Sequence, residues 1–110
     1  MAQNTLEKIE EKIRQNNSLT EENKTELLNL LATLQPEIAE ISKTQAEHAE
    51  SIAGFIERST HEAMRRQKDP TLHRLAIEGL SASVKDFEVS HPKLVETVNY
   101  IANVLANMGI

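Results

Sequence analysis

A run of mostly apolar residues, spaced alternately four and three apart, constrains this chain more than any other feature. Spacing of this kind places side chains along one face of a helix and is typical of the packing seam of a coiled coil. The sequence therefore predicts an all-α fold with a long central helix that packs along this seam. The seam residues are Leu27, Leu31, Leu34, Ile38, Ile41, Gln45, His48, Ile52 and Phe55.

Pro36 interrupts the seam. A proline inside a helix removes one backbone hydrogen bond and clashes with the preceding turn, at a cost of about 3 kcal/mol. The heptad phase nevertheless continues across Pro36, which falls at a position facing away from the seam. Two alternatives remain open: one helix over 21–67 that bends near Pro36, or two helices in register, the second starting at Pro36.

The middle of the seam is polar, since Gln45 and His48 occupy seam positions. Polar residues at such positions fix the register of packed helices at some cost in stability. Beyond them, an apolar cluster around Phe55 lies on an otherwise charged stretch, and such a cluster requires a partner. We therefore expect the chain to form a dimer or higher homo-oligomer. The expected contact residues are Ile41, Gln45, His48, Ile52, Phe55 and Ile56.

Shorter helices are predicted on either side of the seam, at about 5–16, 70–88 and 91–108. The apolar residues of 70–88 cover one arc of a helical wheel, with Leu72 inside the arc and Leu75 at its edge. Only a tight turn separates the last two helices, so they should pack antiparallel as an αα-hairpin.

Several of these helices carry recognisable end signals. Thr20, Asp69 and Ser90 are good N-cap residues, because their side-chain oxygens can accept from a free amide of the first turn. At the C-terminus, Gly109 can adopt the left-handed conformation that ends many helices.

The string Phe-Glu-Val-Ser-His-Pro-Lys-Leu at 87–94 and the ending Ala-Asn-Met-Gly-Ile at 106–110 carry a resemblance. They resemble the end of a family of short bacterial proteins known only as a domain of unknown function. The resemblance is close over 87–110 and looser over 5–34. It implies a small, soluble, all-helical bacterial protein, and it implies no activity.

The composition limits the core. The 110 residues include no Trp and no Cys, two Phe and one Tyr, so the core must be aliphatic. A chain of this length buries only about two-thirds of its unfolded surface, which favours further burial between subunits. The lack of Cys excludes disulfides and thiolate chemistry.

The first residues, Met-Ala-Gln-Asn-Thr-Leu-Glu, lack the basic start and apolar run of a signal peptide. No window approaches the roughly 18 apolar residues of a membrane span. We therefore expect a cytoplasmic protein with no membrane partner. The formal net charge of -5 also argues against nucleic acid as a partner.

Chemical motifs are incomplete. His61 and Glu62 open a stretch similar to a helical zinc motif, but Arg65 stands where the second histidine is needed. Glu88 and His91 form a single Glu-x-x-His pair, whereas di-iron bundles use two. No side chain has a recognisable nucleophile setting, and the glycines form no phosphate loop. We therefore expect no catalytic residue, no metal site, no cofactor and no enzymatic activity.

Residues 58–74 carry five basic and two acidic side chains, a net charge of +3. One interpretation is a solvated helix end, where cations complement the negative C-terminus and pair with a neighbouring subunit. The other is a docking site for an acidic or polyanionic partner. The residues of that docking site would be Arg58, Arg65, Arg66 and Lys68.

Taken together, these patterns predict a single helical domain over 1–110, packed as an oligomeric bundle or coiled coil. The leading hypothesis is a non-enzymatic, self-associating interaction or scaffold protein, with another protein as a further partner. The alternative is a binding module for an acidic or polyanionic partner through the 58–74 block. A helical metal-binding protein is the third alternative.

Overall fold

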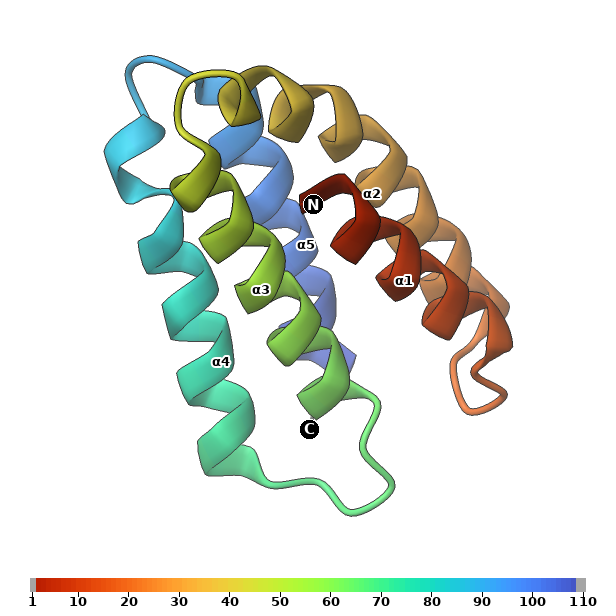
Figure 1. The fold of residues 1–110 in the computed structure, drawn as a ribbon. Helices are drawn as coiled ribbons and strands as arrows, with labels where there is room; N and C mark the ends of the chain where they lie inside the picture. Colours follow the sequence, from red (N-terminus) through yellow and green to blue (C-terminus); the bar gives the residue numbers. More distant parts are fainter. Residues whose placement is uncertain (1, 109–110) are drawn as a thin grey trace.

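α-Helices make up most of the described chain, which comprises residues 2–108 of a computed structural model (Figure 1). No strand occurs within residues 2–108, and the predicted all-α fold is confirmed. In chain order the helices are α1 (Ala2–Gln15), α2 (Glu21–Ser42), α3 (Ala46–Ala63), α4 (Pro70–Ser83), the 3₁₀ helix η1 (Lys85–Phe87) and α5 (Pro92–Met108).

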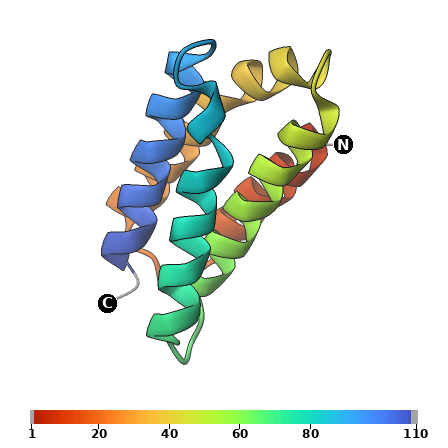
Figure 2. The same cartoon turned by 90° about the vertical axis from the view of Figure 1, so that its left-hand side faces the viewer.

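α3 is the central helix, because it contacts each of the other four α-helices. α4 and α5 lie side by side, as Figure 2 shows, and Figure 1 shows α4 and α1 on opposite sides of α3. α2 packs against α1, α3 and α5. The Cα radius of gyration is 13.0 Å, which matches the value of about 13 Å expected for one globular body of this length.

The chain reverses direction between α2 and α3, at residues 43–45. The amides of Thr44 and Gln45 both donate to the carbonyl of Ile41, at 3.3 and 2.7 Å. Gln45 leaves the helical conformation, with φ −138° and ψ 59°. The prediction of one helix over 21–67 is therefore wrong. The reversal uses the polar middle of the seam, whose exposed side chains stay solvated in the turn.

Pro36 lies inside α2, and helical residues continue on both sides of it. Pro36 itself is exposed. The carbonyl left without a partner amide belongs to Ala32, which is also exposed, so water can bond to it. The alternative of a second helix that starts at Pro36 is wrong.

Two of the predicted caps are confirmed. Thr20 Oγ1 accepts from the Asn23 amide, and Asp69 Oδ1 accepts from the Leu72 amide, each at 3.0 Å. Ser90 is not a cap, because α5 begins at Pro92 and the Ser90 hydroxyl instead lies 3.0 Å from Nδ1 of His91. The predicted stop at Gly109 falls outside the described residues.

The predicted helix over 70–88 is divided. α4 ends at Ser83, and η1 covers the residues that follow. The predicted hairpin is confirmed, since α4 and α5 are in contact.

Aliphatic side chains fill one continuous core, to which all five α-helices contribute. Both halves of the seam belong to it. The largest fully buried side chains are Leu6, Ile9, Ile13, Leu27, Leu31, Leu34, Ile38, Ile41, Ile52, Ile56, Leu80 and Leu94.

Close packing joins α3 to α4. The Ser59 hydroxyl donates to the carbonyl of Ala76 at 3.1 Å. One turn further along, the Phe55 ring lies over Gly79 so closely that an added Cβ there would stand 2.5 Å from Phe55 Cε1. Gly79 therefore provides the space that the ring occupies, while 39% of Phe55 remains exposed.

Replacing Ile52 or Ile101 with Ala should lower the free energy of unfolding by about 2 to 5 kcal/mol in each case. Both side chains are at most 1% exposed, so each change leaves a cavity. Urea denaturation measures the loss. The control is Val89→Ala at a side chain that is 95% exposed, which should change stability by less than about 0.5 kcal/mol. If Ile52→Ala left the free energy of unfolding unchanged, Ile52 could not be a core residue.

The two helical glycines within residues 2–108 should respond differently to Ala. Gly54→Ala should stabilise the protein by about 0.5 to 1 kcal/mol, because an added Cβ meets nothing within 4 Å. Gly79→Ala should not stabilise the protein in this way, because the Cβ added at position 79 collides with the Phe55 ring. Thermal melts compare the two variants, and the gain should return when Gly79→Ala is made in a Phe55→Ala background. Equal gains at both glycines in the wild-type background would contradict the Phe55–Gly79 contact.

Candidate functional site

Three of the six residues expected to mediate self-association lie inside the core of the single chain. Ile41 is 1% exposed, and Ile52 and Ile56 are fully buried. The expectation that they form an intersubunit surface is wrong, because the reversal after α2 makes α3 the central helix of the bundle. Self-association itself remains a prediction, but it requires another surface.

The other three predicted contact residues are exposed and separated. Gln45 lies in the turn before α3, and its side chain makes no capping hydrogen bond. His48 is exposed on α3 and contacts the Phe87 ring edge to face, with ring centroids 5.7 Å apart. Neither residue is buried in the single chain, and their expected role as register markers between packed helices stays a prediction. Of these three residues, only Phe55 has a large apolar side chain that is exposed.

Phe55 joins two leucines on one face of the molecule. Leu72 and Leu75 on α4 are 44% and 51% exposed. They precede Gly79 by seven and four positions, which places all three on the same side of the helix. Because the Phe55 ring covers Gly79, it continues the line of the two leucines. We call Phe55, Leu72 and Leu75 the α4 face.

The basic block is organised around a buried carboxylate. The side chain of Glu62 is only 2% exposed, and its two oxygens pair with Arg65 at 2.9 Å and Arg58 at 3.5 Å. Glu62 raises the pKa of Arg65, first through this hydrogen bond and then through its charge. Two of the four predicted anion-binding residues therefore neutralise an internal acid.

The remaining cations of the block differ in their contacts. Lys68 Nζ donates to the carbonyl of Ala63, the last residue of α3. A cation at this position complements the negative end of a helix. Arg74 Nε lies 3.9 Å from Glu78 on the exposed side of α4. Arg66 is exposed and has no hydrogen bond or ion pair within residues 2–108.

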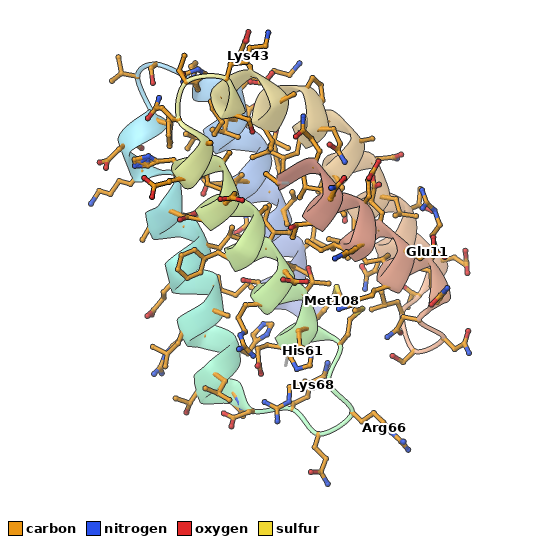
Figure 3. The ribbon with its side chains drawn as sticks, in the orientation of Figure 1. Glu11, Lys43, His61, Arg66, Lys68 and Met108 are labelled. Carbon is orange, nitrogen blue, oxygen red and sulfur yellow. The ribbon has the colours of Figure 1, made fainter. Side chains whose placement is uncertain are left out.

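Three adjoining hollows surround the end of α3. The first, of about 350 Å³, is lined by residues of α1 and α3. The second, of about 640 Å³, follows the end of α3, and the third, of about 360 Å³, reaches the start of α2. His61 lines the first two, and Arg65 and Arg66 line the last two. In Figure 3, His61, Arg66 and Lys68 lie at one end of the bundle and Lys43 at the other.

Sequence reasoning missed four members of these surfaces, namely Lys12 and His61 at the hollows and Leu72 and Leu75 on α4. Lys12 lines the first hollow beside Arg58, but it lies 46 residues earlier in the chain, and no local pattern links the two. Leu72 was assigned to the buried arc of its helix, whereas it is exposed in the first turn of α4.

Two further properties concern metals and membranes. Among residues 2–108, no group of three His, Cys, Asp or Glu side chains is placed to hold a metal ion. Over the same residues, no helix combines the length and the apolar character needed to cross a bilayer.

Comparison with known proteins identifies the chain at family level. Residues 33–110 match the family described as "Domain of unknown function (DUF4404)", and the predicted resemblance to an uncharacterised family is confirmed. No curated protein and no solved structure matches the chain. The match spans more than half of the sequence, including the end of α2, the reversal and all of α3, α4 and α5. The chain therefore belongs to the DUF4404 family, whose function is unknown.

Proposed function

We propose that this protein is a non-enzymatic helical interaction protein that self-associates through the α4 face. The observation that carries the proposal is the alignment of three large apolar side chains that stay 39–51% exposed. Apolar side chains gathered on one surface mark interaction sites more often than single exposed residues do. Self-association is also expected from the sequence, but through the seam; the contact surface proposed here is the α4 face instead.

Charges beside the α4 face favour a second copy of the chain as the partner. Arg74 and Glu78 lie four residues apart on α4, and both side chains are more than 60% exposed. If two copies of α4 pack antiparallel about a two-fold axis, Arg74 of one copy lies near Glu78 of the partner subunit, and the reverse also holds. The same surface is therefore complementary to itself in charge as well as in apolar character.

The small size of the α4 face determines how tightly two copies of the chain are expected to associate. Complete burial of a Leu or Phe side chain contributes about 1.5 to 3 kcal/mol, and these three side chains are already about half buried. The gain is small compared with the entropy lost on association. We therefore expect a reversible, concentration-dependent dimer rather than an obligate one.

The non-enzymatic part of the proposal rests on the sequence, in which no side chain has a recognisable nucleophile setting. A cytoplasmic location also remains a prediction from the sequence.

Light scattering on a sizing column, with loading from tens of micromolar to about 1 mM, should report a mass that rises from monomer towards dimer. Leu75→Glu should keep the mass at that of a monomer, because it places a charge in the centre of the α4 face. Val89→Glu is the matched control, since it makes the same change in charge at a 95% exposed site elsewhere. A wild-type mass that stays monomeric at every concentration, or equal effects of the two variants, would refute the α4 dimer.

Charge reversal tests the antiparallel arrangement. Arg74→Glu should weaken the dimer, because it opposes Glu78 of the partner subunit with a like charge. Adding Glu78→Arg should restore association, because the exchanged pair is again self-complementary. Sedimentation equilibrium gives the dimer dissociation constant for each variant. A double variant as weak as Arg74→Glu alone would exclude this pairing.

A further inference from the structure

A second surface, at the end of the bundle where α3 stops, gathers basic side chains from distant parts of the chain. They come from α1, from α3 and from the segment between α3 and α4, and all of them line the three adjoining hollows. Figure 3 labels three of them, His61, Arg66 and Lys68, at this end of the bundle. We call this set the basic end: Lys12, Arg58, His61, Arg65, Arg66 and Lys68.

Four of the six side chains of the basic end form no ion pair within residues 2–108. Lys12, His61 and Arg66 form no side-chain hydrogen bond or ion pair with any residue from 2 to 108. Arg65 directs one nitrogen to Glu62, and the remaining donors of a guanidinium stay available to a second acceptor. Of the described residues that line the three hollows, Glu57 is the one with an acidic side chain. Basic side chains therefore outnumber carboxylates in the described lining of these hollows.

The contacts already made at this end hold three of the six basic side chains in place. Glu62 fixes Arg58, one turn before it on α3, and Arg65, just after α3 ends, and the carbonyl of Ala63 fixes Lys68. Fixed donors lose less entropy when a ligand binds than freely moving surface side chains do. Arg and Lys are also the side chains that proteins use most often to bind phosphate groups.

The surroundings limit the size of the ligand. Each hollow measures about 350 to 640 Å³, a volume typical of small-molecule sites. The chain as a whole carries a formal charge of -5, so a long polyanion would meet acidic surface beyond the basic end. A compact anion with several charges can contact two adjoining hollows, which share lining residues, without this repulsion.

We propose that the basic end binds a compact anion with two or more linked phosphate groups. The middle hollow, lined by His61, Arg65 and Arg66, takes one phosphate, and Lys12 or Lys68 in the flanking hollows takes the next. Inorganic polyphosphate chains and nucleoside triphosphates share this chemistry. The site does not depend on the α4 face, since none of its residues belongs to that face.

Isothermal titration calorimetry with inorganic tripolyphosphate tests the site on the full-length protein. We expect saturable binding that weakens as salt rises from about 50 to about 200 mM. The double variant Lys12→Ala/Arg66→Ala should bind at least about tenfold more weakly, since it removes two charge-assisted contacts. Circular dichroism checks that the variant is folded, and neither residue has a partner within residues 2–108 whose loss would unfold it.

The matched control removes two charges from the opposite end. Lys43→Ala/Lys93→Ala changes the net charge by the same amount at two exposed lysines and should leave tripolyphosphate affinity within about twofold. Equal weakening by both double variants would mean that only net charge matters, and the absence of saturable binding up to about 1 mM would also overturn the site.

Two further probes define the ligand class. ATP should bind at least as tightly as tripolyphosphate, and tighter binding would show that a nucleoside adds contacts to the phosphate site. Duplex DNA should bind no more tightly than tripolyphosphate, because its length brings it against acidic surface. Tight DNA binding that is lost in Lys12→Ala/Arg66→Ala would overturn the compact-anion proposal in favour of an extended polyanion.

Discussion

The reversal of the chain between α2 and α3 is the constraint on which the rest of the structure depends. It directs the two apolar halves of one heptad series into a common core, where Ile41 and Ile52 are both buried. In a chain with one Tyr and no Trp, burial of aliphatic side chains must supply most of the stabilisation, and neither half of the series could remain exposed at low cost. α3 thus becomes the central helix, and the surfaces available to partners are those that α3 does not bury.

Those surfaces lie on separate elements and differ in chemistry. The α4 face is apolar and lies beside a self-complementary charge pair, whereas the basic end surrounds a buried carboxylate. Both surfaces depend on how α3 is packed. Phe55 on α3 reaches the α4 face because Gly79 leaves room for its ring, and Glu62 on α3 fixes two arginines of the basic end. The central helix therefore organises both candidate interaction sites while contributing little exposed apolar surface of its own.

Local signals in the sequence predict the helical class, the aliphatic core and the caps at Thr20 and Asp69, because each of these depends on neighbouring residues. The position of the reversal could not be predicted in this way. The heptad phase runs through residues 43–45, which include neither Gly nor Pro, while Pro36 suggests a break at a point where the helix continues. For the candidate sites, periodicity identified Phe55, and the local charge balance identified the basic block. The contribution of Lys12 and the burial of Glu62 follow only from tertiary packing.

A distance between α2 and α3 tests the reversal most directly. Spin labels at the exposed positions Glu22 and His61 would be about 58 Å apart on one continuous helix, at a rise of about 1.5 Å per residue. In the folded-back chain the two ends meet, because Asn23 and Ala63 line the same hollow, and the longest dimension of the molecule is 38 Å. Pulsed electron spin resonance on labelled protein diluted with unlabelled protein should therefore report a distance well below 38 Å. A distance near 58 Å would contradict the reversal and return the seam to an intermolecular role.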